Sequence, residues 1–132
     1  MPDRRLIAIV DDDEPFRTAL QALLRSSRFN NVSFTSAEQF LRSRHARRTA
    51  CVIADVNMPG MTGLQLHERL VASGRKVPVI LITAHPDDSV RRNALGAGVV
   101  CYLIKPFAAD DLFACLRQAL RPRRSGASDT TA

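Results

Sequence analysis

Short apolar runs alternate with amphipathic stretches along this chain of 132 residues. The stretch after the first run places Phe16, Leu20 and Leu24 on one face of a helix, with Pro15 tolerated in its first turn. Because most of the runs are apolar on both faces, they are typical of parallel strands covered by helices on both sides. The alternation therefore predicts a doubly wound α/β sandwich of five strands and five helices. The strands are expected at residues 6–10, 32–35, 51–56, 77–83 and 99–104.

The later helices have start signals and inward faces of their own. Ser36 followed three residues later by Gln39 predicts a capping box at the start of the second helix. The third helix is expected around residues 63–72, and Asp110 and Asp111 stand near the positive end of the last helix. The residues expected to point inward are Ala37, Phe40 and Leu41 in the second helix, Val90, Ala94 and Ala97 in the fourth, and Leu112, Cys115, Leu116 and Ala119 in the fifth.

The composition fits one folded domain. Hydrophobic residues make up 45% of the chain and charged residues 24%, the usual balance of a soluble globular protein. No apolar stretch is long enough for a transmembrane helix, and residues 1–5 lead directly into the first strand without a signal-peptide core. We therefore expect a domain over residues 1–120, a flexible basic tail or the start of a linker over 121–132, and a cytoplasmic location without membrane contact.

The three cysteines, Cys51, Cys101 and Cys115, lie inside apolar segments. Their number is odd and no two of them have CxxC spacing, which argues against a disulfide framework or a zinc site. They are expected to be small residues of the core.

The net charge of +6 comes mainly from arginine, because Lys76 and Lys105 are the two lysines among 19 basic residues. The arginines concentrate in the segments RSRHARR (42–48) and RPRR (121–124). A basic surface can attract nucleic acid or an acidic partner. No aromatic residues interleave these charges as a base-stacking surface requires, so a solvated face and a charged tail are the favoured interpretation.

Polar residues follow four of the expected strands at the point where each strand ends. They are the acidic run of residues 11–14, then Asp55, Thr83 and Lys105. Parallel strands end on the same edge of a sheet, so these side chains are expected to converge there. Two carboxylates 4 Å apart repel each other by roughly 4 kcal/mol at an effective dielectric constant near 20, and this repulsion favours a bound cation. Oxygen ligands without His or Cys indicate a hard ion, most plausibly Mg²⁺.

A carboxylate, a divalent ion, an ammonium and a hydroxyl around one point are typical of phosphoryl transfer. Asp55 is the candidate nucleophile, which would accept the group as an aspartyl phosphate. Lys105 and the ion would neutralise the phosphoryl oxygens, and Thr83 would hydrogen-bond one of them. Each of these residues alone is better explained as structural, but their joint placement at one sheet edge favours a functional site.

With these residues in place, the chain resembles the receiver domains of bacterial two-component response regulators. The resemblance covers roughly residues 5–120 and rests on IVDDDEP, VIADVNMPGMTG, ILITAH, GAGVVCYLIKPF and the final amphipathic helix. It is closest to regulators fused to a LuxR-type helix-turn-helix domain. The resemblance implies a flavodoxin-like fold with strand order 2-1-3-4-5. The chain is then either a free-standing receiver or a part of a longer regulator.

Roles at the acceptor site follow from the resemblance. Asp55 resembles the phosphoacceptor, and Asp11 and Asp12 resemble the acidic pair that holds Mg²⁺, with Mn²⁺ as an alternative ion. The family pattern implies that Asp12 binds the ion directly and Asp11 through water, with the backbone carbonyl of Asn57 as another ligand. Asn57 also stands at a position that tunes the lifetime of the phosphoryl group.

The resemblance also implies a set of switch residues. Thr83 resembles the switch hydroxyl, Tyr102 the aromatic switch residue, and Lys105 the phosphoryl-binding lysine. The bond before Pro106 is commonly cis in the family. His85 is a second lifetime-tuning position, and a role as an ordinary loop residue is equally consistent with the sequence.

The implied function is a switch rather than an enzyme. A sensor histidine kinase or phosphotransfer protein would phosphorylate Asp55 in a Mg²⁺-dependent step. Movement of Thr83 and Tyr102 would then reshape the surface of the fourth helix, the fifth strand and the last helix, where we expect a homodimer contact or an output partner. DNA binding would belong to a separate effector domain.

Two other functions share part of this pattern. Phosphohydrolases of the haloacid dehalogenase type also use a strand-end Asp, a Thr or Ser, a Lys and Mg²⁺. Their nucleophile starts a DxD motif on the first strand, whereas here Asp55 is on the third strand and position 57 is Asn. A flavin-binding flavodoxin would need phosphate-binding groups in the first loop, where this chain has four acidic residues.

Overall fold

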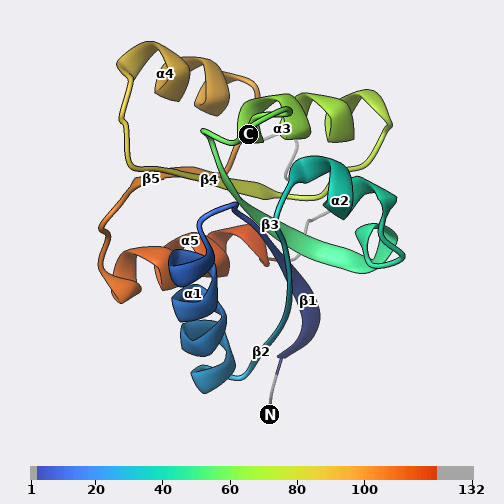
Figure 1. Cartoon of the computed structure of the whole chain (residues 1–132), viewed down its shortest axis with the longest axis vertical. Coiled ribbons are helices and arrows are strands. Elements are labelled where there is room, and N and C mark those ends of the chain that lie inside the picture. Colours follow the sequence, from blue (N-terminus) through green and yellow to red (C-terminus); the bar gives the residue numbers. More distant parts are fainter. Residues whose placement is uncertain (1–2, 122–132) are drawn as a thin grey trace.

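One parallel sheet of five strands forms the centre of the molecule, in the order β2-β1-β3-β4-β5 (Figure 1). The computed structural model describes residues 3–121, without the side chains of residues 3 and 4. The expected tail therefore lies outside the described residues except for Arg121. The order and the parallel pairing confirm the flavodoxin-like fold. The strands are β1 (Asp3–Val10), β2 (Phe29–Phe34), β3 (Thr49–Asp55), β4 (Val79–Thr83) and β5 (Cys101–Ile104).

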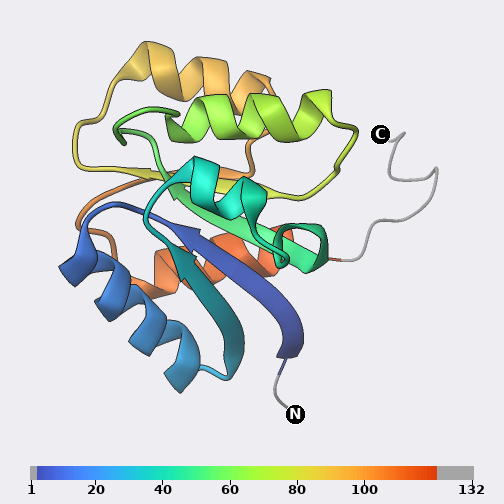
Figure 2. The ribbon, with the colours of Figure 1, turned by 45° about the vertical axis from the view of Figure 1, so that its right-hand side comes forward.

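Helices cover both faces of the sheet (Figures 1 and 2). One face carries α1 (Glu14–Ser26) and α5 (Ala109–Ala119), and the other carries α2 (Ala37–Arg42), α3 (Gly63–Ala72) and α4 (Asp88–Gly96). A short 3-10 helix, η1 (Ala46–Arg48), leads into β3. Within residues 3–121, no helix has the length and apolar character needed to cross a membrane.

The strands contribute to two cores because alternate side chains point to opposite faces of a sheet. Ile53 and Ile80 are fully buried against α1 and α5, whereas their neighbours Ala54 and Leu81 are fully buried against the other three helices. Each fully buried large aliphatic side chain contributes about 1.5–3 kcal/mol to stability. This double burial is what the continuous apolar runs of the sequence predicted.

Several strands differ in length from the expectation. β2 begins at Phe29, three residues early, because it pairs with β1 from that residue on. β4 begins at Val79, after Pro78, which has no N–H for the ladder. β5 begins at Cys101, because Val99 donates its N–H to the Ala94 carbonyl and closes the end of α4 instead.

The predicted capping box at α2 is only half formed. Ser36 Oγ accepts the N–H of Gln39 at 3.0 Å, but the Gln39 side chain accepts from the N–H of Thr35, one residue before the cap. A reciprocal box occurs instead at the start of α3, where the side chains of Thr62 and Gln65 each accept the other's N–H. The sequence pattern therefore predicted the start of α2 and the Ser36 cap correctly, but the Gln39 side chain accepts its hydrogen bond from Thr35 instead of Ser36.

The predicted inward faces of the helices are confirmed with one exception. Ala97 is exposed, because α4 ends at Gly96 and Ala97 only caps it. The residues found buried are Ala37, Phe40, Ala94, Leu112, Cys115 and Leu116, and those packed partly buried against the core are Leu41, Val90 and Ala119.

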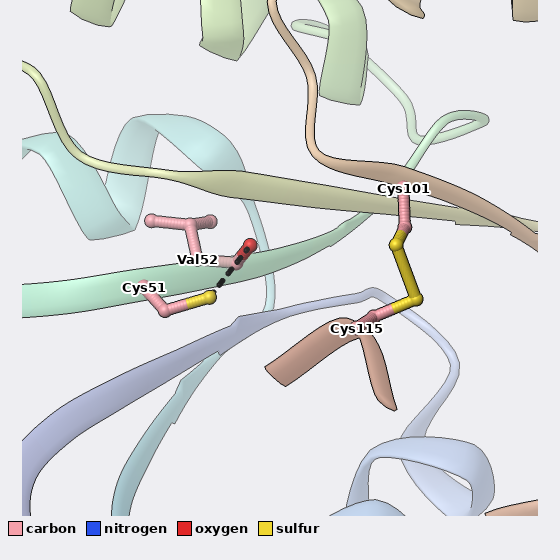
Figure 3. Close-up of a disulfide and its surroundings, with 4 residues drawn as sticks. All are labelled: Cys51, Val52, Cys101 and Cys115. Atoms are coloured by element: carbon pink, nitrogen blue, oxygen red, sulfur yellow. Dashed lines mark hydrogen bonds between the residues drawn. A yellow bond between two sulfur atoms is a disulfide. The ribbon is translucent and has the colours of Figure 1, made fainter. Parts of the chain in front are cut away.

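As predicted, all three cysteines belong to the core, on the α1 and α5 side of the sheet, but the expectation that they form no disulfide is wrong. Cys101 on β5 and Cys115 on α5 form a disulfide, with their Cα atoms 6.1 Å apart (Figure 3). Cys51 is free and buried, which raises the pKa of its thiol to about 12. Counting and local spacing missed the pair because the packing of α5 on β5 brings together two residues 14 positions apart. The bond ties the last helix to the strand at the edge of the sheet.

The disulfide predicts a specific thiol count. When the protein is denatured without reductant and treated with iodoacetamide, intact-mass measurement should find one alkylated cysteine per chain, Cys51, and three after reduction. In the Cys51→Ser variant, no alkylation should occur before reduction. Three alkylated cysteines in the unreduced wild type would contradict the disulfide.

Candidate functional site

Four polar residues meet at the edge of the sheet where the strands end. Asp11 directly follows β1 and Asp55 is the last residue of β3. Thr83 is the last residue of β4, and Lys105 directly follows β5. Asp11, Asp55 and Thr83 are all buried. The four side chains therefore lie at the same edge of the sheet, as the order of strands in the sequence predicted.

Lys105 bridges the two buried carboxylates. Its Nζ atom lies 3.1 Å from Asp11 Oδ2 and 3.0 Å from Asp55 Oδ2. The ammonium also lies 4.0 Å from the ring centroid of Phe16, on α1. A cation over an aromatic ring is stabilised by the ring quadrupole, so Phe16 helps to hold the lysine in this position.

The other oxygen of each carboxylate orders the loop that follows it. Asp11 Oδ1 accepts the N–H of Asp13 at 2.9 Å, and Asp55 Oδ1 accepts the N–H of Asn57 at 2.8 Å. Both bonds span two residues, as in an Asx-turn. Each carboxylate thus holds its own loop with one oxygen and Lys105 with the other.

The Thr83 hydroxyl is held by two donors. Its Oγ1 accepts from Asn57 Nδ2 at 3.0 Å and from the N–H of His85 at 2.9 Å. The loops after β3 and β4 are therefore linked through this hydroxyl. The His85 side chain is exposed, so only its backbone takes part in this contact.

Burial and the ion pairs oppose each other in setting the charges of the site. Burial raises the pKa of Asp11, and the nearby charge of Asp55 acts in the same direction, while the N–H of Asp13 and Lys105 lower it. Burial alone would lower the pKa of Lys105, but its hydrogen bonds to Asp55 and Asp11 outweigh this and raise it. Lys105 is therefore a permanent ammonium at neutral pH.

Three carboxylates of the site can hold a metal ion. One oxygen each of Asp11, Asp12 and Asp55 lie within 4.8 Å of one another. Two of these residues are buried, and Asp12 is exposed, which leaves room for water on one side. An all-oxygen set of this kind suits Mg²⁺, which keeps several waters and needs few protein ligands.

The rest of the acidic run points away from the site. Asp13 caps α1, with its Oδ1 accepting the N–H of Phe16 at 3.2 Å, and Glu14 is the first residue of that helix. Carboxylates at a helix N-terminus are stabilised by the helix dipole. Asp13 and Glu14 therefore have a structural explanation that Asp12 lacks.

Tyr102 lies outside the carboxylate cluster. Its ring is partly buried against the core on β5, and its hydroxyl accepts the N–H of Asp87 at 3.2 Å. Asp87 begins α4 as its N-cap, and hydrogen bonds from Val90 and Ser89 lower the pKa of its carboxyl. Tyr102 is therefore connected to the loop after Thr83 rather than to Asp55. The Lys105–Pro106 bond is cis.

Two contributors to the site were not recognised from the sequence. Phe16 was expected only as a core residue of α1, and nothing in its spacing indicates that Lys105 lies over it. Gly63 begins α3 so close to β3 that a Cβ atom there would lie 2.5 Å from the Asp55 carbonyl oxygen. A glycine directly after the Thr62 cap was the available signal for this close approach.

Comparison with known proteins gives a consistent assignment. The family described as Response regulator receiver domain matches residues 7–117. Response regulator protein TmoT of Ectopseudomonas mendocina is 37% identical over 116 residues, which is 88% of this chain and 53% of that protein. Transcriptional regulatory protein FixJ of Bradyrhizobium diazoefficiens is 36% identical over 87% of this chain and 56% of its own length. This chain thus spans about half the length of these relatives.

Solved structures agree with these matches. The crystal structure titled FixJ-N aligns with a TM-score of 0.82 and 31% identity, covering 95% of this chain and 99% of that one. Response regulator StyR aligns with a TM-score of 0.82 and 36% identity, covering 90% of this chain and 60% of that one. The haloacid dehalogenase alternative finds no support in these matches.

The close approach of α3 to β3 predicts that Gly63→Ala is strongly destabilising. The added Cβ would also meet Leu81 Cδ2 at 2.9 Å, so helix and strand must separate; overpacking of this kind typically costs about 1–3 kcal/mol or more. Gly96→Ala is the matched control, because a Cβ at Gly96 meets nothing within 4 Å. Urea denaturation should show a lower midpoint only for Gly63→Ala, and equal midpoints would contradict the packing described.

Proposed function

Because this chain belongs to the family of response regulator receiver domains, we propose that it is a phosphoacceptor switch of two-component signalling. Asp55 takes a phosphoryl group from the phosphohistidine of a sensor histidine kinase or phosphotransfer protein. The observation that carries the proposal is the buried Asp55 carboxylate, whose Oδ2 lies 3.0 Å from Lys105 Nζ beside two further carboxylates.

In the transfer, a carboxylate oxygen of Asp55 attacks the phosphorus atom while the P–N bond of the phosphohistidine breaks, and the imidazole nitrogen leaves with the bonding electrons. Lys105 already lies against Asp55 and Asp11, so its ammonium is in position to neutralise an incoming phosphoryl oxygen. A bound divalent ion would supply further positive charge there. The ligands we propose for Mg²⁺, or for Mn²⁺ in its place, are Asp11, Asp12, Asp55 and the backbone carbonyl of Asn57.

The hydrogen bonds of Thr83 suggest how phosphorylation is transmitted. To bind a phosphoryl oxygen, the Thr83 hydroxyl must turn toward Asp55, which changes its contacts with Asn57 and His85. Tyr102 accepts from Asp87 in the loop that follows. A shift of that loop would break this bond and free the Tyr102 ring to move inward, so Thr83 and Tyr102 are the proposed switch residues.

The surface altered by this switch is formed by α4, β5 and α5. Leu95 on α4 and Ile104 on β5 are large hydrophobic residues left 39% and 46% exposed, which is consistent with a contact surface for a homodimer or an output partner. Sequence-specific DNA recognition would belong to a separate effector domain, in line with relatives named transcriptional regulatory proteins. We propose that the domain works in the cytoplasm, and that its chemistry is limited to its own phosphorylation and dephosphorylation.

The central test is phosphorylation of wild type and Asp55→Asn. With a small phosphodonor and Mg²⁺, intact-mass measurement should show one phosphate adduct on the wild type and none on Asp55→Asn, because the amide is not a nucleophile. EDTA should abolish the adduct. Asp110→Asn is the control, since Asp110 is exposed in the first turn of α5 and should be phosphorylated normally on Asp55. An undiminished or metal-independent adduct on Asp55→Asn would overturn the proposal.

We further propose that Asn57 and His85 set the lifetime of the phosphoryl group: the Asn57 side chain donates to the Thr83 hydroxyl, and the backbone N–H of His85 donates to the same oxygen, which places the exposed His85 side chain at the rim of the site. If the His85 side chain shields the acyl phosphate from water, His85→Ala should speed its hydrolysis by about 2- to 10-fold, which is up to about 1.4 kcal/mol of barrier. The decay is followed by intact mass after removal of the phosphodonor. Mg²⁺ affinity, measured by calorimetry, should not change. Equal decay rates would refute the role of His85.

A further inference from the structure

The charged residues of the domain are divided between the two edges of the sheet. In Figure 2, β1, β3 and β4 begin on the right-hand side of the molecule and run toward the left. Helices that return antiparallel to the strands end at the edge where the strands begin, which we call the amino edge. The residues that define the basic face of this edge are Arg25, Arg28, Arg42, Arg44, Arg47, Arg48, Arg75, Lys76, Arg117 and Arg121.

These residues come from segments far apart in the sequence. Residues 25–28, 42–48 and 75–76 precede β2, β3 and β4, and residues 117–121 end α5. No Asp or Glu occurs in residues 25–29, 42–49, 73–78 or 117–121. Nine of the ten side chains are exposed, and Arg75 is half-buried. Within residues 3–121, none of the ten forms an ion pair. The sequence favoured a solvated Arg-rich face and a charged tail, and the fold brings basic residues of several segments to one edge of the sheet.

A hollow at this edge shows the convergence directly. It has a volume of about 240 Å³ and is lined by Arg5 at the start of β1, Lys76 before β4 and Arg121 after α5, with an apolar floor. The Arg5 guanidinium donates to the Leu120 carbonyl, so the end of α5 is fixed against β1. The basic face is therefore continuous from the loop before β4 to the end of the last helix.

The opposite edge carries most of the acidic residues; within residues 3–121 the exceptions are Asp3, which begins β1, and Glu68 on α3. The carboxylates there are Asp11, Asp12, Asp13, Glu14, Glu38, Asp55, Asp87, Asp88, Asp110 and Asp111. An anionic macromolecule is repelled by that edge and attracted by the amino edge, so only one orientation is favourable. This separation of basic and acidic residues between the two edges arises from the fold and does not follow from the net charge alone.

We propose that the basic face of the amino edge is a sequence-independent docking surface for the phosphate backbone of duplex DNA. Neighbouring strands lie about 4.8 Å apart, so the loops before β2 and β4 are separated by roughly 15 Å, too far for one carboxylate or phosphate to contact both. A duplex instead offers one negative charge per about 1.7 Å of its axis. A spread array of cations therefore matches a spread array of phosphates.

The predominance of arginine over lysine in the basic face is also consistent with a phosphate backbone as the partner. Nine of the ten residues are arginines, whose planar guanidinium pairs with phosphate through two parallel hydrogen bonds. The aromatic residue beside Arg28 is Phe29, whose ring is half-buried and stacks on Phe113, so it does not offer the exposed stacking surface that a single-stranded partner would need. Because the face is made of loops and helix ends, it can contact the backbone but has no helix to read base edges.

Two other occupants fit the observations less well. The acidic edge of a second copy would meet the basic face in a head-to-tail contact, which produces rings or open filaments rather than a two-fold dimer, and it would cover the Asp55 site. An acidic polypeptide has the required charge, and its carboxylates also pair with arginine through two hydrogen bonds, but its charges lack the fixed, regular spacing of a duplex backbone. Both remain outcomes of the test below.

The test measures fluorescence anisotropy of a labelled mixed-sequence duplex of about 20 base pairs, with the unphosphorylated 132-residue chain, between 50 and 200 mM salt. The wild type should bind with a log–log salt slope of about −3 or steeper. The edge variant Arg47→Glu, Arg48→Glu should bind at least about 10-fold more weakly, with the slope reduced by about 2. The control Arg91→Glu, Arg92→Glu makes the same charge change in the first half of α4, away from the amino edge, and should lose less than about 3-fold.

The outcomes separate this proposal from its rivals and from the phosphoacceptor function. The edge variant should still form the phosphate adduct on Asp55, so a failure of docking does not mean a failure of phosphorylation. Absence of binding at 50 mM salt, or equal losses in the two double variants, would overturn the proposal. So would tighter binding to polyglutamate than to DNA, which indicates an acidic polypeptide, or DNA-free assembly in sedimentation that the edge variant loses, which indicates a second copy.

Discussion

The contact of Lys105 with Asp11 and Asp55 is the constraint on which the site depends. Two buried carboxylates at the ends of adjacent strands repel each other, and the ammonium compensates this repulsion with bonds of 3.1 and 3.0 Å. Lys105 follows β5, which is separated from β3 by β4. Its side chain must therefore cross the end of β4, and its N–H donates to the Thr83 carbonyl at 2.8 Å on the way. The cation is tied to the same strand that carries Thr83, the proposed switch residue.

Because each oxygen of the Asp55 carboxylate accepts a hydrogen bond from a different group, a change of charge at Asp55 affects two sets of contacts. Oδ2 holds Lys105, and Oδ1 holds the N–H of Asn57, whose side chain in turn holds Thr83. A phosphoryl group on Asp55 would disturb all three contacts together. The disulfide between β5 and α5 joins two of the three elements of the proposed output surface, so they are expected to respond as one unit.

The sheet and the core of the site could be predicted from the sequence because both depend on local pattern and topology. Apolar runs such as 51–56 give a buried parallel strand, and parallel strands bring Asp55, Thr83 and Lys105 to one edge whatever the details of packing. The Cys101–Cys115 pair and the Phe16–Lys105 contact depend on how a helix is rotated and placed over the sheet. The spacing of residues within α1 or α5 does not determine how either helix lies over the sheet, so neither contact could be predicted from the sequence.

The opposite charges of the two edges can coexist because the strands keep them apart. A strand of five to eight residues is about 17–27 Å long, which exceeds the Debye length of about 8 Å at physiological ionic strength. The acidic edge therefore keeps the negative potential that attracts a divalent ion, and the basic face keeps its own potential. In a parallel sheet, every loop before a strand lies on one edge and every loop after a strand on the other. A chain of this topology can thus encode two independent electrostatic surfaces by alternating the charge of successive loops.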